Sequence, residues 1–254
     1  MKILKLGGSV ITDKAGYRTP RPERIRALAK AVAAIWKKGA RDLVLVHGAG
    51  SFGHALVIKH GIADGVGNTA QKLGYADTHA ACSELSLLLV EELIIQGVPA
   101  VSIAPALIMS LKNRRISSFN TKIVNEYLQS GYLPVLYGDM VPDSERGGSP
   151  CSGDQIVSYL GKGADMIILA TDVDGVLDDK GQVIPEITSS SFPEVSKHLR
   201  DNAAGGKDVT GAMAGKIKEL LSINTVSYIV NAGNPERIDA ILSGKNVICT
   251  KVKK

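Results

Sequence analysis

Aromatic residues and cysteines are scarce in this chain of 254 residues. Phe, Trp and Tyr together make up 4% of it, and the three cysteines, Cys82, Cys151 and Cys249, show no CxxC spacing. An odd, scattered set of cysteines argues against a disulfide framework or a zinc site and favours a reducing, cytoplasmic location. No apolar run reaches the ~20 residues of a membrane helix, and the chain opens into a strand-like segment, so we expect neither a membrane partner nor a signal peptide.

The chain also lacks a concentrated basic region, although its formal net charge is +5. Lysines and arginines are spread along the sequence, apart from a short tail that we expect to be a solvated end, at Lys251, Lys253 and Lys254. Nucleic-acid binding usually requires a basic stripe or a recognisable motif, and neither is present. A modest positive excess instead suits a protein that handles small polyanions.

The order of apolar segments predicts an α/β fold. Hydrophobic residues make up 44% of the chain and are mostly Val, Ile, Leu and Ala, which suits a parallel sheet covered by helices. Strands are predicted at 2–6, 42–46, 99–103, 133–137, 166–170, 226–230 and 246–250, and a small hairpin near 114–116. Helices are predicted from 22 to a stop at Gly39 and over 75–96, 121–129, 152–160 and 235–242, with a loop passing into a helix over 208–223. This alternation predicts a doubly wound, mainly parallel sheet in one domain over residues 1–254, with ligands beyond the carboxyl ends of the strands.

Two glycine-rich segments follow the first two predicted strands. KLGGS contains Lys5, Gly7, Gly8 and Ser9, and its glycines would let backbone amides approach phosphate oxygens. An ordinary tight turn explains the same letters, and Lys14 nearby is by itself a surface lysine. HGAGSFGH, at residues 47–54, places three glycines and a serine where a helix begins, which is a natural anion site, although His54 alone is more often structural.

Three further segments carry charged residues after predicted strands. SGDQ at 152–155 holds Asp154, TDVDGV at 171–176 holds Asp172 and Asp174, and DVTGAMAGK at 208–216 ends in Lys216. The plain alternatives are a helix cap, a tight turn and a surface loop. Each signal is weak alone.

In this order, the five segments resemble the amino-acid-kinase superfamily along nearly the whole chain. ITDK together with GSFGH is similar to the archaeal isopentenyl phosphate kinases within it. The resemblance implies a three-layer αβα sandwich with a mainly parallel central sheet, with the acceptor in the N-terminal half and the nucleotide in the C-terminal half. It implies ATP-dependent phosphorylation of isopentenyl phosphate to the diphosphate, and a homodimer. Mg²⁺ can be held largely by the phosphates and water, with few protein ligands.

The resemblance also assigns roles to residues. It implies that Lys5 and Lys216 flank the transferring phosphoryl group, that Asp154 orients them, and that Lys14 and His54 contact phosphates. The residues implied for ATP are Lys5, Gly7, Gly8, Ser9, Gly50, Asp172, Asp174, Val176, Gly211, Ala212 and Lys216. Those implied for the acceptor are Ala49, Gly50, His54, Gly138 and Gly153. Ala49, Ala212 and Ala214 stand where many relatives have glycine.

Two other functions remain open from the sequence. A fosfomycin-type phosphonate kinase shares much of the pattern, including a similar histidine loop, and differs in the acceptor, as would another small-acid kinase of the same superfamily. A non-catalytic nucleotide-binding module on the same fold is the second, although it need not retain Lys5, Lys14, Asp154 and Lys216 together. For an isoprenoid acceptor, the segments 85–93 and 104–109 are expected to form the wall around the hydrocarbon tail.

Overall fold

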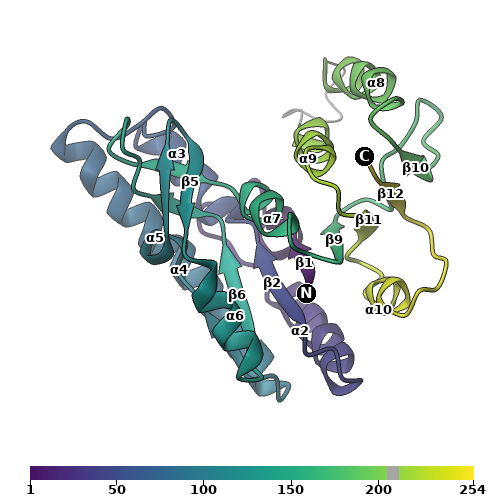
Figure 1. Ribbon diagram of the computed structural model, residues 1–254. Helices are drawn as coiled ribbons and strands as arrows, with labels where there is room; N and C mark the ends of the chain where they lie inside the picture. Colours follow the sequence, from purple (N-terminus) through teal and green to yellow (C-terminus); the bar gives the residue numbers. More distant parts are fainter. Residues whose placement is uncertain (205–211) are drawn as a thin grey trace.

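An eight-stranded sheet forms the centre of the molecule in a computed structural model that describes residues 1–204 and 212–254 (Figure 1). The strand order is β10-β12-β11-β9-β1-β2-β6-β3, and neighbours are parallel except for β11 and β12. The strands are β1 (Lys2–Leu6), β2 (Leu43–His47), β3 (Ala100–Ser102), β6 (Leu133–Tyr137), β9 (Met166–Thr171), β10 (Glu186–Ile187), β11 (Ser227–Asn231) and β12 (Thr250–Val252). The predicted mainly parallel sheet is confirmed.

Helices cover both faces of the sheet, which is therefore the middle layer of an αβα sandwich (Figure 1). One face is covered by α2 (Pro22–Lys37), α4 (Thr69–Ile95) and α10 (Glu236–Leu242). The other is covered by α6 (Thr121–Gln129), α7 (Gly153–Gly161), α8 (Phe192–Ala204) and α9 (Ala212–Leu221). Two separate apolar cores result, one on each face.

Each central strand contributes side chains to both cores, because successive residues face opposite sides of the sheet. Ile3 and Val44 belong to the core under α7, whereas Leu4 and Leu45 belong to the core under α2 and α4. Successive strand residues point to opposite faces, so a strand buried on both sides must be apolar throughout. Each such side chain contributes about 1.5–3 kcal/mol of hydrophobic stabilisation.

Short helical segments follow β1 and β2 at their carboxyl ends. The one-turn helix α1 (Gly8–Ile11) follows β1, where the sequence suggested a phosphate loop or a simple turn. The 3-10 segment η1 (Gly50–Phe52) and then α3 (His54–Lys59) follow β2. Because β1 and β2 are parallel neighbours, these loops emerge side by side at one edge of the sheet.

Two small antiparallel pairs lie outside the main sheet. Strands β4 (Met109–Lys112) and β5 (Arg115–Phe119) form the predicted hairpin, preceded by α5 (Pro105–Ile108), and β7 (Asp139–Val141) pairs with β8 (Ser149–Cys151). The hairpin turn places Asn113 and Arg114 at φ values of 47° and 68°. Their amides donate to the Asp143 carboxylate at 3.1 and 2.7 Å, which stabilises this left-handed turn.

Helix α4 begins earlier than predicted. It starts at Thr69 rather than near 75, because the Asn68 side chain accepts a hydrogen bond from the Gln71 amide and caps the helix. Gly74 lies inside the helix, where it packs against His60. Within residues 1–204 and 212–254, no helix is both long enough and apolar enough to cross a membrane.

The last predicted strand was misplaced. The sequence predicted a strand over 246–250, but β12 begins only at Thr250 and ends at Val252. Thr250 accepts the Val176 amide through its hydroxyl at 2.7 Å and donates to the Ile184 carbonyl at 2.7 Å. These tertiary contacts, together with antiparallel pairing to β11, determine where the strand forms.

Candidate functional site

Two lysines from opposite ends of the chain meet at one aspartate. Lys5 lies near the end of β1, Asp154 in the first turn of α7 and Lys216 on α9. The Lys5 Nζ atom lies 2.7 Å from Asp154 Oδ1, and the Lys216 Nζ atom lies 3.5 Å from Asp154 Oδ2. With both lysines and the aspartate ionised, this triad carries one net positive charge, which an anionic ligand would neutralise.

Burial affects the ionised forms of Lys5 and Asp154 differently. The side chain of Lys5 is 5% exposed and that of Asp154 is 22% exposed. Burial lowers the pKa of Lys5, Lys216 adds to this effect, and Asp154 opposes it. Burial would raise the pKa of Asp154, but the two ammonium groups outweigh it and lower that pKa. The carboxylate is thus stabilised, whereas the Lys5 ammonium is held at a cost that a bound polyanion would reduce.

The loops that follow β1 and β2 touch through their backbones. A Cβ atom at position 8 would lie 2.5 Å from the Gly50 N atom, and one at position 48 would lie 2.6 Å from the Gly8 N atom. Gly50 also has a φ of 52°, a left-handed conformation that glycine adopts readily. Side chains at these positions would force the loops apart. The glycines therefore bring the first turns of α1 and η1 together.

Two backbone nitrogen atoms lie close to Gly138. A Cβ atom at position 138 would lie 3.3 Å from Ala49 N, 3.4 Å from Gly153 N and 3.5 Å from the Cys151 carbonyl oxygen. Gly153 is the first residue of α7, where backbone N–H groups have no partner within the helix. A Cβ atom at Gly153 would itself lie 3.4 Å from the Lys5 Cε atom, so this group adjoins the triad. We name the Ala49 and Gly153 amides, with the space over Gly138, the amide cradle.

Gly138 and Gly7 shape the site without offering their own amides. The Gly138 N–H donates to the His47 carbonyl at 2.9 Å, and the Gly7 N–H donates to the Ala170 carbonyl at 2.8 Å. Both donors are already used within the fold. Their place in the site therefore rests on the absence of a side chain.

His54 lies close to the triad, as the sequence suggested. It is the first residue of α3 and is exposed to solvent. Partial burial lowers its pKa, the Lys216 ammonium adds to this effect, and the Asp154 carboxylate opposes it. A neutral imidazole keeps one N–H donor, which can hold a phosphate oxygen.

Lys14 and Asp172 join the loop after β1 to the loop after β9. The Lys14 Nζ atom lies 3.3 Å from Asp172 Oδ2, with both side chains largely exposed. Burial works against the charge of Asp172, but Lys14 and a hydrogen bond from Ser9 outweigh it and lower its pKa. The predicted residues Ser9, Lys14 and Asp172 therefore lie together.

The two other residues predicted from TDVDGV have partners in the fold. Asp174 forms an ion pair with Arg237, at 2.5 Å, and accepts a hydrogen bond from Asn231 Nδ2 at 3.1 Å. Val176 is 1% exposed and its amide donates to the Thr250 hydroxyl. Both roles are structural, and neither requires a nucleotide.

Part of the predicted C-terminal loop lies outside the described residues. This applies to Gly211 and to the beginning of DVTGAMAGK at 208–211. Ala212 begins α9, the helix that carries Lys216.

Sequence reasoning missed a buried carboxylate that directly follows Gly138. The Asp139 side chain is fully buried, and its two oxygens lie 2.9 and 3.0 Å from His79 Nδ1. Burial raises the pKa of Asp139 while His79 opposes it, and the same hydrogen bond raises the pKa of His79. The sequence signal was an Asp directly after a glycine at a strand end, within GDMVPD.

The expected apolar wall was partly wrong. Leu85, Leu89 and Leu93 are fully buried in the core between α4, the sheet and α2. They stabilise the fold and offer no surface to a ligand. In the second segment, the Ala106 amide of α5 lies 3.4 Å from Asp139 Oδ2, while Leu107 is 83% exposed.

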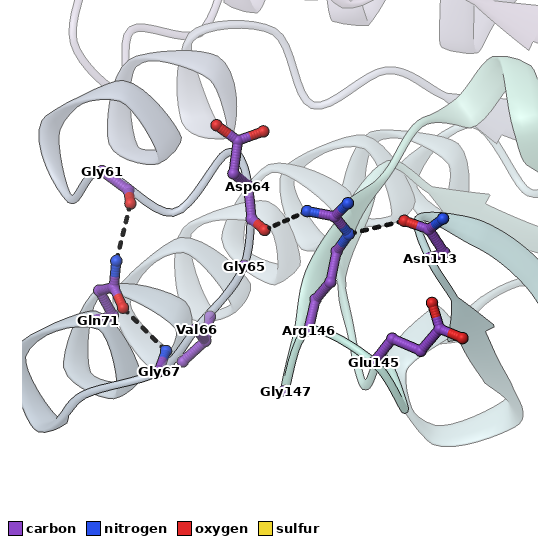
Figure 2. A pocket seen from close by; sticks show the side chains of 10 residues that line it. All are labelled: Gly61, Asp64, Gly65, Val66, Gly67, Gln71, Asn113, Glu145, Arg146 and Gly147. Carbon is purple, nitrogen blue, oxygen red and sulfur yellow. Dashed lines mark hydrogen bonds between the residues drawn. The ribbon is translucent and has the colours of Figure 1, made fainter.

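A surface hollow of about 700 Å³ lies between the loops 61–67 and 145–147 (Figure 2). Arg146 spans it, donating to the Asp64 carbonyl at 2.7 Å and to Asn113 Oδ1 at 2.9 Å. The residues that line this hollow include neither the triad nor the amide cradle. Because these polar groups already bond to one another, the hollow is no candidate for phosphate chemistry.

No cluster of three or more His, Cys, Asp or Glu side chains in the described parts of the chain could hold a metal ion. The carboxylates nearest the predicted phosphates, Asp154 and Asp172, both contact lysines. A divalent cation with oxygen ligands from bound phosphates and water fits these surroundings better than a cation in a protein cage.

Comparison with known proteins gives a consistent result over the whole chain. Residues 1–229 match the amino acid kinase family. The isopentenyl phosphate kinase of Methanothermobacter thermautotrophicus is 35% identical over 99% of this chain and 98% of its own length. The isopentenyl phosphate kinase of Thermoplasma acidophilum is 31% identical over 95% of this chain and 96% of its own length.

Solved structures agree with the sequence matches. One isopentenyl phosphate kinase structure superposes with a TM-score of 0.85 at 30% identity, covering 100% of both chains. A substrate complex of an isopentenyl phosphate kinase superposes with a TM-score of 0.75 at 28% identity, again over 100% of both chains.

Proposed function

The chain belongs to the amino acid kinase family, and from this premise we propose that it transfers the γ-phosphoryl group of ATP to isopentenyl phosphate. The products are isopentenyl diphosphate and ADP. Four relatives of 31–35% identity over nearly the whole chain are isopentenyl phosphate kinases. The observation that carries the proposal is the triad of Lys5, Asp154 and Lys216 beside the amide cradle.

The chemistry of this transfer matches the groups present. An oxygen of the acceptor phosphate attacks the γ-phosphorus, the bond from that phosphorus to the bridging oxygen of ATP breaks, and ADP departs. A phosphate monoester with a second pKa near ~6 is largely dianionic at neutral pH, so no strong general base is needed. The transition state is loose, and the protein contributes mainly position and charge neutralisation.

In this proposal the acceptor phosphate occupies the amide cradle. The Ala49 and Gly153 amides, with Gly50 and the His54 imidazole, donate to its oxygens, and Gly138 leaves room for them. Amides that are fixed before the ligand arrives need little reorganisation, which favours the transition state over the ground state.

The lysines neutralise the charge that two polyanions bring together. Lys5 and Lys216 flank the transferring phosphoryl group, and Asp154 orients them. Lys14 exchanges Asp172 for a phosphate oxygen. A lysine acts as a mobile point charge, which suits a group that must follow the phosphoryl group as it moves.

The nucleotide is proposed to lie across the loops after β1 and β9. Gly8 and Ser9, in the first turn of α1, would donate to phosphate oxygens. Gly7, Gly50, Asp172 and Ala212 are also assigned to the ATP site in this proposal. When bound with ATP, Mg²⁺ would supply positive charge that offsets the repulsion between phosphates, and it would be held by phosphate and water oxygens rather than by protein side chains.

We further propose one domain, a cytosolic location and a homodimer. The continuous sheet supports one domain, and the three free cysteines suit a reducing compartment. On α4, Leu73, Leu87 and Ile94 are 53–69% exposed at multiples of seven residues, the spacing of a helix–helix seam. Light scattering after gel filtration tests the dimer.

The experiment that tests the function is an acceptor panel. Purified protein receives ATP and Mg²⁺ with isopentenyl phosphate, with fosfomycin, or with no acceptor, and ADP release is measured. We expect turnover with isopentenyl phosphate. Turnover with fosfomycin alone would identify a phosphonate kinase, and tight ATP binding without turnover on either acceptor would indicate a binding module.

A pair of histidine variants sharpens this panel. His54→Ala should raise KM for isopentenyl phosphate far more than KM for ATP. His60→Ala is the matched control, because His60 lies at the other end of α3 and bonds to Asp77 at 2.9 Å. Equal effects from both variants would contradict the role of His54.

A further inference from the structure

His47 is a buried imidazole that the proposed mechanism does not use. It ends β2 and has no exposed surface. Its ring stacks on Tyr137, with centroids 5.4 Å apart and the ring planes 16° apart. An imidazole is an unusual choice for a fully buried strand position, since an apolar ring would stack equally well.

The hydrogen bonds of His47 define its tautomer. Its Nδ1 atom lies 3.1 Å from the Gly48 carbonyl oxygen, which can only accept, so Nδ1 carries the hydrogen. Burial lowers the pKa of His47 to about 4, and the ring is therefore neutral at physiological pH. Nε2 is then a bare acceptor, and no partner for it exists among the described residues.

The Gly48 carbonyl belongs to the same peptide plane as the Ala49 N–H. In a trans peptide these two groups point in opposite directions. By holding the carbonyl, Nδ1–H directs the Ala49 N–H away from the imidazole. A Cβ atom built at Gly138 would lie 3.3 Å from Ala49 N and 3.4 Å from Gly153 N, so the two nitrogen atoms border the same space.

We propose that His47 is a positioning residue that holds the Gly48–Ala49 peptide in the orientation in which Ala49 donates to the acceptor phosphate. Glycine at position 48 makes this control necessary, because a glycine lets the peptide rotate at little cost. A rotated peptide would turn its carbonyl toward the phosphate and repel it. This inference rests on the proposed function of the amide cradle.

Because Nε2 has no partner in the part of the chain that the structure describes, stability and affinity measurements can distinguish this positioning role from simple packing. A buried acceptor without a donor destabilises the fold, so replacement by an apolar ring should preserve or increase stability. We therefore expect His47→Phe to unfold at the same temperature as the wild-type protein or higher, while it loses acceptor affinity. A residue kept only for packing would not separate stability from affinity in this way.

Three variants test whether the hydrogen-bond donor must lie at the position of Nδ1 on the side chain of residue 47. An Asn amide reaches about as far as Nδ1, whereas a Gln amide reaches about as far as Nε2. We expect His47→Phe and His47→Gln to raise KM for isopentenyl phosphate roughly tenfold or more, as for the loss of a hydrogen bond to a charged group. His47→Asn should stay within a few-fold of wild type, and KM for ATP should change little in all three.

A turnover-free measurement uses inorganic phosphate as the probe. Labelling with ¹³C-carbonyl glycine and ¹⁵N-alanine restricts the carbonyl-filtered amide spectrum to the four Gly–Ala pairs, at Ala40, Ala49, Ala164 and Ala212. Labelling serine and glycine in the same way leaves Gly131, Gly153 and Gly244. In the wild-type protein, phosphate should shift Ala49 and Gly153 saturably. In His47→Phe, Gly153 should still respond and Ala49 should not.

The outcomes separate the two proposals. The role of His47 would be overturned if phosphate did not shift the Ala49 signal in the wild-type protein, or if it shifted that signal equally in His47→Phe. Equal effects of His47→Asn and His47→Gln on KM would also overturn this role. These two variants still test the role if His47→Phe does not fold. If Ala49 behaves as expected but isopentenyl phosphate is not turned over, the positioning role stands and the proposed acceptor is wrong.

Discussion

Lys5–Asp154 and Lys14–Asp172 are the same chemical pair in two different environments. The first is 2.7 Å long, with side chains 5% and 22% exposed. The second is 3.3 Å long, with side chains 71% and 49% exposed. Water and salt screen the second pair, which should contribute at most about 1 kcal/mol. The first is desolvated, so removing one partner leaves uncompensated buried charge.

The local structure explains why the two lysines differ. Lys5 lies inside β1, whose backbone is paired on one side with β2 and on the other with β9. Lys14 lies outside the sheet, in the loop between α1 and α2 that an antiparallel bridge between Thr12 and Pro20 closes. The buried pair is therefore suited to fixed charge placement, and the exposed pair to a lysine that changes partners during the reaction.

The largest effect is expected from breaking the buried pair. Asp154→Asn keeps the shape of the side chain but leaves Lys5 and Lys216 without their counter-charge. We expect a loss of about 3 kcal/mol in the free energy of unfolding. We also expect kcat lower by on the order of 10²- to 10³-fold, the effect of losing one preorganised electrostatic group.

Urea unfolding and single-turnover phosphoryl transfer measure these two quantities. The control is Asp239→Asn, since Asp239 pairs with an exposed lysine, Lys38, at 2.6 Å. If Asp154→Asn were as stable and as active as that control, burial would not distinguish the two kinds of pair.

Breaking the exposed pair should affect activity without affecting stability. Lys14→Ala should change the free energy of unfolding by less than about 0.5 kcal/mol, as for other surface substitutions. Its kcat/KM for ATP and isopentenyl phosphate should fall roughly 10- to 100-fold, because a charged hydrogen bond to phosphate is lost.

Lys112→Ala is a close match for this test. Lys112 lies 3.7 Å from Glu145, and the two side chains are 67% and 48% exposed. Lys112→Ala should change neither the free energy of unfolding nor kcat/KM. A Lys14→Ala protein with wild-type kinetics would show that the second pair is only a surface contact.

The smallest effect is a difference in acid sensitivity. The pKa of Asp154 is lowered from its ordinary value near 3.8, so the unfolded state binds the proton more readily. The stability that this carboxylate contributes is present above pH 3.8 and is lost as the pH falls through the lower folded value. Between pH 6 and pH 3, Asp154→Asn should therefore lose less stability than the wild-type protein.

Asp172→Asn provides the comparison for this measurement. The pKa of Asp172 is also lowered, but its side chain is half exposed and screened by solvent. In thermal melts, the drop in melting temperature from pH 6 to pH 3 should be reduced, relative to the wild-type protein, less by Asp172→Asn than by Asp154→Asn. The reverse order would mean that exposure does not govern these carboxylates.

Local signals in the sequence located the glycine-rich loops at the strand ends. Glycines at strand ends predicted the anion loops, and the structure brings Gly8, Gly48 and Gly50 into backbone contact. Ser152 was visible as a helix cap, and its hydroxyl accepts the Gln155 amide at 3.2 Å. Such features depend on neighbouring residues, and a linear sequence displays them directly.

Contacts between distant residues were not visible in the same way. The carboxylate of Asp139 and the imidazole of His79 come from β7 and α4, and neither segment carried a recognisable signal for the other. The sequence also left His47 as the first letter of a glycine-rich run, with no sign that one ring nitrogen is bonded and the other is not.

By itself, the sequence determined the alternation of strands and helices, the two-sided burial of the central strands and the glycines at their carboxyl ends. These follow from periodicity and backbone freedom, which act over a few residues. The resemblance implied that Asp154 orients Lys5 and Lys216, but only the tertiary structure decided how closely the three meet and that the Ala49 and Gly153 nitrogen atoms both lie near Gly138. It also decided which lysine is buried. Burial and charge pairing depend on strand order and helix packing, because those bring distant parts of the chain within a few ångströms.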